Sequence, residues 1–105
     1  MQQVNEQSTA YLTVTFRNKA GVAEAPATAK YRIDDVASGS AVLGETAITP
    51  VAATVEVRLT PANNTLLVAG NPAELRRVTV IGEYGQDDAV TSEYLYEVVN
   101  LSGVS

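Results

Sequence analysis

The chain has 105 residues, of which 46% are hydrophobic and 18% are charged, and its formal net charge is −5. A chain of this length and apolar content can bury one core, so one folded domain is expected rather than a disordered chain. The negative charge argues against a nucleic-acid partner, whose phosphates would repel it, and the lack of Cys excludes disulfides and thiolate metal sites.

The first nine residues are polar and lack the basic and apolar regions of a signal peptide. No apolar run approaches the ~20 residues of a membrane span, so no membrane partner is expected. The predicted organisation is an N-terminal arm at residues 1–9, one domain at residues 10–100 and a C-terminal tail at residues 101–105. The arm and the tail have too little apolar content to order themselves, so we expect neighbouring proteins to supply their contacts.

Apolar and polar residues alternate with a period of two along most of the chain, which predicts half-buried β-strands. The alternation is weak at Ala41–Thr46 and clear in five other segments. These five are Ala10–Asn18, Thr28–Val36, Thr54–Thr60, Arg76–Tyr84 and Thr91–Asn100. Within the first segment, Leu12, Val14 and Phe16 are predicted to enter the core. Their expected contacts in the facing sheet are Val55, Val57 and Leu59, or Val78 and Val80.

Turn residues separate these segments, for example at Asn18–Gly21 and Ser38–Ser40. Short strands joined by turns, without a helical period, predict an all-β fold. The expected architecture is an immunoglobulin-like antiparallel β-sandwich of about six or seven strands. The chain lacks the Cys pair and the Trp of an antibody domain, so packing of the fibronectin III-like kind is expected. Pro61–Leu75 is the longest irregular segment and is expected to hold a helical turn or a short extra strand.

Two pairs of adjacent acids are candidate chemical groups, Asp34 with Asp35 and Asp87 with Asp88. Adjacent strand residues point to opposite faces, so Asp34 and Asp35 cannot converge on one ion unless the chain bends. We therefore expect Asp34 to end a strand and Asp35 to open a turn and accept backbone N–H bonds. The alternative is a Ca²⁺ site formed by both pairs, because an immunoglobulin-like topology would bring the two loops to the same end. Neither loop has the spacing of a dedicated site, so no metal is predicted.

Tyrosine dominates the aromatic residues, with five Tyr against one Phe. Tyr94 and Tyr96 fit two interpretations, half-buried strand positions or a contact surface. The basic pair Arg76–Arg77 is interpreted as a charge pair at a strand edge. The predicted partner-binding residues combine the arm, the last strand and the tail. They are Met1, Gln2, Gln3, Val4, Tyr94, Tyr96 and Leu101.

Enzyme activity is not expected. The chain has no His, so neither a Ser/His/Asp nor a Cys/His arrangement can form. The phosphate-binding and nucleophile motifs G-x-x-x-x-G-K-[ST], G-x-G-x-x-G and G-x-S-x-G are also missing from the sequence. We therefore predict no catalytic residues and no cofactor.

Four stretches in combination resemble small proteins encoded by tailed bacteriophages. In chain order they read YRIDDVASGSAVLGE, VEVRLTPANNTLL, ELRRVTVIGEYG and TSEYLYEVVNLSG, and they cover most of Lys30–Gly103. Such proteins are similar to immunoglobulin-like or fibronectin-like β-sandwiches placed on phage particles. The resemblance implies that the pair Asp34 and Asp35 closes a strand and takes part in no reaction.

The resemblance further implies a structural protein of the virion, made in the host bacterial cytoplasm. The expected role is capsid decoration, in which the protein binds the major capsid protein, other virion proteins and copies of itself and reinforces the head through many contacts. The first alternative is a subunit of the head–tail connector or of the tail. The second is a host-surface or carbohydrate-binding module, although such modules usually display aromatic platforms and the chain has no Trp.

Overall fold

The structure is a computed structural model that describes residues 2–49, 51–68, 70–85 and 88–100. These residues form seven strands and one short 3-10 helix. The strands are β1 (Gln2–Asn5), β2 (Ala10–Thr15), β3 (Thr28–Asp35), β4 (Ala41–Ala47), β5 (Thr54–Leu59), β6 (Ala73–Gly85) and β7 (Asp88–Val99), and the helix η1 is Ala62–Asn64. The predicted all-β class is confirmed. Strands β2 to β7 each lie within, or closely overlap, one of the six segments predicted from the alternation.

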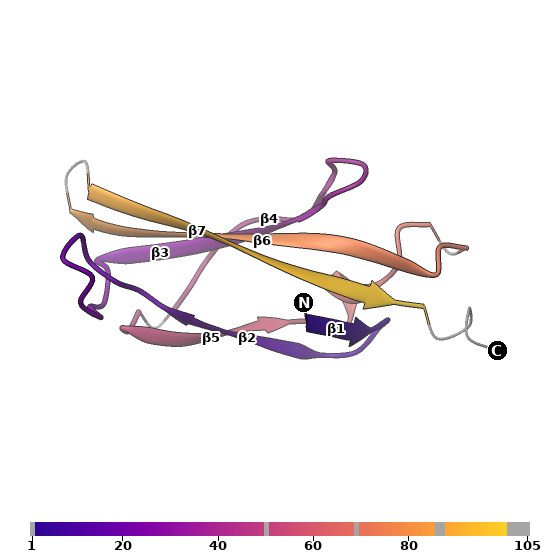
Figure 1. The fold of residues 1–105 in the computed structure, drawn as a ribbon, viewed down its shortest axis with the longest axis horizontal. Coiled ribbons are helices and arrows are strands. Elements are labelled where there is room, and N and C mark those ends of the chain that lie inside the picture. The colour runs from indigo at the N-terminus through magenta and orange to yellow at the C-terminus, as the bar shows by residue number, and fades with distance from the viewer. Residues whose placement is uncertain (1, 50, 69, 86–87, 101–105) are drawn as a thin grey trace.

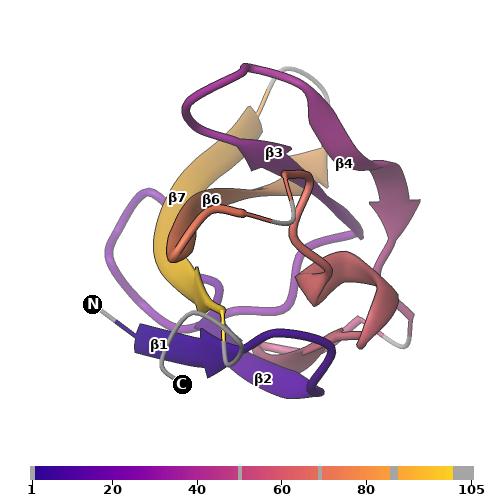
Figure 2. The same cartoon turned by 90° about the vertical axis from the view of Figure 1, so that its right-hand side faces the viewer.

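The strands form two facing layers (Figure 1). One layer is a five-stranded sheet in the order β1-β7-β6-β3-β4, and the other is the antiparallel pair β2-β5. Neighbouring strands are antiparallel except β1 and β7, which run parallel. Seen from the end, the larger sheet curves until β1 lies beside β2 of the other layer (Figure 2). The fold is therefore a pair of sheets closed along one side by β1.

The N-terminal residues form a strand, so the predicted arm at residues 1–9 is wrong for Gln2–Asn5. β1 pairs with the end of β7, from Tyr96 to Val99, and the side chain of Val4 is buried in the core. A strand of four residues with one apolar side chain is too short to give a period-two signal. Backbone hydrogen bonds to β7 and the burial of Val4 stabilise it nevertheless. Met1 and the predicted tail at residues 101–105 lie outside the described residues.

The apolar core lies between the two layers. It consists of Val4, Ala10, Val14, Phe16, Ala29, Ile33, Ile48, Val57, Leu59, Leu66, Val78, Val80, Tyr96 and Val98. The predicted core face is confirmed, because Val14 and Phe16 are buried and Leu12 packs against the cluster. β5 lies in the same sheet as β2, so the first predicted contact set does not face β2. The second set, Val78 and Val80 of β6, belongs to the facing sheet, which also contributes Ile33 of β3 and Val98 of β7 to the core.

Phe16 packs on β6 at the position of Gly82. A Cβ atom on Gly82 would lie 2.8 Å from Cδ1 of Phe16 and 3.4 Å from Cβ of Pro26. A distance of 2.8 Å is shorter than van der Waals contact between carbon atoms. The aromatic ring therefore occupies the space that any side chain at position 82 would need.

The irregular segment Pro61–Leu75 contains the helical turn η1 and the first residues of β6. The prediction of a helical turn is thus confirmed. β6 begins at Ala73, three residues before the predicted start at Arg76. The early start extends the strand to one end of the sandwich and adds the charged residue Glu74, two positions before Arg76.

Candidate functional site

Arg76 is the centre of a buried polar cluster at this end of the sandwich. Alternation along β6 places it on the same face as the core residues Val78 and Val80, and its side chain is 0% exposed. Its Nη1 donates to Oδ1 of Asp35 at 2.8 Å, and its Nη2 lies 2.9 Å from Oε1 of Glu74. The interpretation of Arg76 as a strand-edge charge is therefore wrong, because β6 has a neighbouring strand on each side.

Glu74 binds the segment that follows η1 through hydrogen bonds. Its carboxylate accepts the backbone N–H groups of Leu67 at 2.8 Å and Val68 at 3.0 Å, and the side-chain amide of Asn71 at 2.8 Å. Burial alone would raise the pKa of Glu74, but these donors and Arg76 lower it to about 2. With four donors bound, the carboxylate has no lone pair left for a metal ion or a substrate.

The adjacent acids of β3 point to opposite faces, as predicted. Asp35 faces the core, binds Arg76 and accepts the backbone N–H and the hydroxyl of Ser38 at 3.0 Å and 2.7 Å. Asp34 faces the other side and accepts two hydrogen bonds from Arg32, which raises the pKa of that guanidinium. The predicted backbone contact of Asp35 at the turn is confirmed.

Asp35 and Asp88 lie at opposite ends of the larger sheet, so the arrangement assumed for a calcium site is wrong. Asp35 is opposite Arg76, whereas Asp88 is opposite Gly85 at the far end of β6. At ~3.3 Å per strand residue, this separation is roughly 30 Å. Asp87 lies outside the described residues. Within the described ranges, no three acidic side chains are placed so that they could hold a metal ion.

Asn64 connects three parts of the chain beside this cluster. Its Nδ2 donates to the carbonyl of Ser8 at 2.7 Å, its carbonyl accepts the N–H of Gln7 at 2.8 Å, and its Oδ1 accepts the hydroxyl of Tyr96 at 3.0 Å. Burial raises the pKa of Tyr96 to about 12, against an opposing effect of Arg76. Tyr96 is 3% exposed, so its predicted contact with a partner is wrong.

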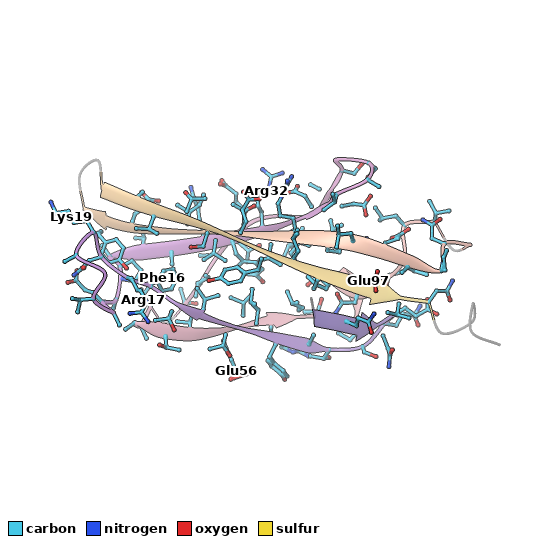
Figure 3. All side chains as sticks on the ribbon, viewed as in Figure 1. Phe16, Arg17, Lys19, Arg32, Glu56 and Glu97 are labelled. Atoms are coloured by element: carbon cyan, nitrogen blue, oxygen red, sulfur yellow. The ribbon has the colours of Figure 1, made fainter. Side chains whose placement is uncertain are left out.

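The other predicted partner-binding residues do not form one exposed patch. Val4 is buried, which contradicts its predicted role, and Tyr94 is half-buried against the core. Gln3 is exposed, and its side-chain amide donates to Oε1 of Glu97 at 2.9 Å. Figure 3 shows Glu97 on β7. Met1, Leu101 and the side chain of Gln2 lie outside the described residues.

A pocket of about 460 Å³ opens beside the buried cluster. It is lined by Asp35, Ala37, Ser38, Ser40, Leu67, Val68, Asn71, Ala73, Glu74 and Leu75. Leu67 and Val68 are 51% and 58% exposed, and exposed Val36 is joined to Leu75 by a backbone hydrogen bond. The carboxylates of the wall are already bound by N–H donors, so the surface offered to another molecule is largely apolar.

Sequence reasoning missed Glu74, Arg76 and Asn64. The alternation through Val78 and Val80, extended two and four residues backwards, places Arg76 and Glu74 on the core face. Buried charges need partners, so this extension would have pointed to an internal ion-pair cluster. Asn64 gave no such signal, because an irregular segment has no period.

Comparisons with protein-family models, with curated proteins and with solved structures find no match. Among the described residues, no helix is long and apolar enough to cross a membrane. The function is therefore inferred from the residues of this chain and from the resemblance that its sequence carries.

Replacing Glu74 with glutamine is expected to lower the free energy of unfolding by about 3 kcal/mol at pH 7. The side-chain NH₂ group of the glutamine would face N–H donors that now bind an oxygen of the Glu74 carboxylate. The folded pKa of Glu74 lies below its ordinary value of 4.5, at about 2. Its stabilising effect is thus complete above pH 4.5 and is lost as the pH falls towards 2.

Urea unfolding at pH 7 and at pH 2.5 checks this expectation, with Glu93→Gln as the control. Glu93 lies 3.5 Å from Arg77 in an exposed pair, and exposed pairs contribute about 0–1 kcal/mol. The gap between Glu74→Gln and the wild type should shrink at low pH. A gap that is equal at both pH values would contradict the assigned role of the carboxylate.

Proposed function

We propose that this chain is a structural protein of a bacteriophage virion that decorates the assembled head, binds the major capsid protein and reinforces the shell. The observation that carries the proposal is the exposed apolar rim formed by Leu67 and Val68 on a preordered loop. The resemblance to phage particle proteins supplies the class of partner. Such a role needs no catalytic group and no cofactor.

Hydrogen bonds from the buried cluster and from Asn100 hold the loop that carries the rim. Glu74 binds the backbone of both rim residues, and Arg76 donates to the carbonyl of Thr65 at 3.0 Å. The side chain of Asn100 donates to the carbonyl of Asn71 at 2.8 Å. A loop ordered in advance loses little conformational entropy on binding. Burial of its apolar side chains by a partner then contributes about 25 cal/mol per Å².

We also propose that the fold is immunoglobulin-like. In that architecture strands B and E share one sheet and strands C, F and G share the other, with C′ next to C in the variable type. β2 and β5 correspond to B and E, β3, β6 and β7 to C, F and G, and β4 to C′. The order of the strands in the two sheets supports this assignment. The rim then belongs to the loops of one end of the sandwich.

The variant Leu67→Ser/Val68→Ser is expected to lose binding to heads assembled without the protein, with little change in its own stability. Both side chains are exposed, so their removal costs the isolated domain about 0.5 kcal/mol or less. Their N–H bonds to Glu74 involve the backbone and are kept. Co-sedimentation with heads measures the binding, and a thermal melt measures the stability.

Val22→Ser is the matched control, because Val22 is 59% exposed in the loop that follows β2. It should bind heads as the wild type does. Imaging of particles then gives the location. Hundreds of copies on the shell support decoration, whereas a ring of about six or twelve copies indicates a connector or tail subunit. Full binding by the double serine variant, or glycan binding without any head binding, would contradict the proposal.

A further inference from the structure

We propose that two copies of this chain associate edge to edge through β5, about a two-fold axis at Val57. The two-stranded sheets of the copies would join into one antiparallel sheet of four strands. The inference goes beyond the proposed function, because the residues of β5 carry it and the rim of Leu67 and Val68 takes no part in it. The association would hold for the isolated protein as well as on a particle.

The free edge of β5 presents backbone groups in a regular series. Among the described strands, β2 is the one neighbour of β5. The N–H of Phe16 donates to the carbonyl of Ala53 at 2.7 Å, in the same register as the β2–β5 ladder. Hydrogen-bonded and non-hydrogen-bonded pairs alternate along an antiparallel ladder. Val55 and Val57 therefore bond to β2, and the N–H and C=O groups of Glu56 and Arg58 point to the open side.

The sequence of β5 is complementary to itself in one antiparallel register. With Val57 opposite Val57, Glu56 of each copy faces Arg58 of the other, and Val55 faces Leu59. Glu56 and Arg58 then form one hydrogen-bonded pair on each side of the axis, and each pair exchanges two backbone hydrogen bonds. Side chains of opposite charge meet on the outer face, and apolar side chains meet on the core face. A shift by one residue would place Val57 opposite Arg58 and mix the two faces.

Glu56 and Arg58 are available for this contact. Both are exposed, and Figure 3 shows Glu56 pointing away from the sandwich. Neither forms an ion pair within the described part of the chain, whereas Lys30, Arg32 and Arg77 each pair with an acid of their own sheet. Cross-strand pairs of opposite charge stabilise antiparallel strands. Two such pairs would form at the symmetric contact.

Two hollows lie next to β5. One hollow of about 150 Å³ is lined by Glu56, Val57 and Arg58, among others, and a second of about 210 Å³ is lined by Thr54, Val55 and Glu56, among others. Ile48 and Thr49, which precede β5 in the chain, line both hollows as well. A strand paired with β5 would cover half-buried Val55.

The other sheet edges of the described chain are less suited to such pairing. β4 has two register shifts against β3, and bulges of this kind disturb the regular edge that a partner strand needs. β2 carries no charged residue that could fix a register with a second copy. β1 has four residues, so its edge is shorter than that of β5. β5 alone combines a regular ladder with charges placed symmetrically about its centre.

Reversal of one charge is expected to weaken the dimer, and reversal of both is expected to restore it. Glu56→Arg brings arginines together in both pairs, and Arg58→Glu brings carboxylates together. Each should lower the association constant about tenfold or more. The combined variant Glu56→Arg/Arg58→Glu exchanges the charges and should return to within about threefold of the wild type. Sedimentation velocity over a concentration series measures all four proteins.

Glu83→Arg is the matched control, because it makes the same change of charge at an exposed position of β6. It should leave the association constant unchanged. A wild type that stays monomeric up to about 1 mM overturns the proposal, because a dissociation constant above about 1 mM would be too weak for a specific dimer. A dimer that tolerates both single reversals, or that the combined variant fails to restore, overturns it as well.

A cysteine scan tests the position of the axis. The chain has no Cys, so one introduced thiol can form a disulfide only with a second copy. Opposite Cα atoms in a non-hydrogen-bonded pair lie about 4.5 Å apart, within the range of a disulfide. Val57→Cys should therefore form covalent dimers under mild oxidation. Val55→Cys, on the same face but opposite Leu59 of the second copy, should not, and equal cross-linking of the two variants would exclude this register.

Discussion

Replacement of Arg76 with methionine is expected to lower the free energy of unfolding by about 3–5 kcal/mol. Methionine fills similar volume, but it leaves the carboxylates of Asp35 and Glu74 buried without their shared cation. It also frees the carbonyl of Thr65, which accepts a hydrogen bond from Arg76. A loss of this size is a large part of the ~5–15 kcal/mol that stabilises a typical domain.

Arg77→Met is the control, because it removes the neighbouring arginine from the outer face of the same strand. Arg77 is 40% exposed and lies 3.5 Å from an acid that is 60% exposed. Such a pair contributes about 0–1 kcal/mol. Denaturant unfolding of both variants should thus separate the two arginines by several kcal/mol. Equal, small losses would mean that the buried cluster does little for stability.

Phe16→Ala is expected to destabilise the protein by about 3–5 kcal/mol, because it opens a cavity where the ring now fills the space between the sheets. The ring is buried and packs on the bare backbone of Gly82. Gly82→Ala should cost about 1–3 kcal/mol for the opposite reason, since the added methyl group would overlap the ring.

The two changes should not be additive. Once Phe16 is shortened, a methyl group at position 82 meets empty space and should cost much less than it does opposite the ring. A double-mutant cycle by urea denaturation is expected to give a coupling energy of about 1 kcal/mol or more between Phe16 and Gly82. Additive losses, or a loss below 1 kcal/mol for Phe16→Ala, would place the ring away from position 82.

Much of the fold could be predicted from local pattern, since a half-buried strand repeats its polarity at every second residue. This is why β2, β3 and β5 lie close to the predicted segments and why the core position of Phe16 was predicted correctly. Sheet membership was harder, because the alternation of β2 and β5 tells which side faces inward and not which strand is the neighbour. β1 could not be predicted, because β7, more than 90 residues away in sequence, provides its hydrogen bonds.

The candidate site was predictable only in its local part. The Asp35 contact with Ser38 lies within one turn, so the residue types and the end of the strand predicted it. The ion pair between Asp35 and Arg76 joins residues 41 positions apart, and it depends on β3 and β6 being neighbours. The apolar rim depends in turn on Glu74, whose donors Leu67, Val68 and Asn71 come from a segment without any period.

The parallel pairing of β1 with β7 has a mechanical consequence. A force that draws the start of β1 away from the end of β7 acts along the strands, so the hydrogen bonds of this short ladder are sheared together. An antiparallel hairpin pulled at its open end would instead break one bond at a time, because the load falls on the outermost pair. Val4 is also buried opposite Val98. Tension on the described chain therefore loads the hydrogen bonds and the buried side chains of this sheet edge at the same time.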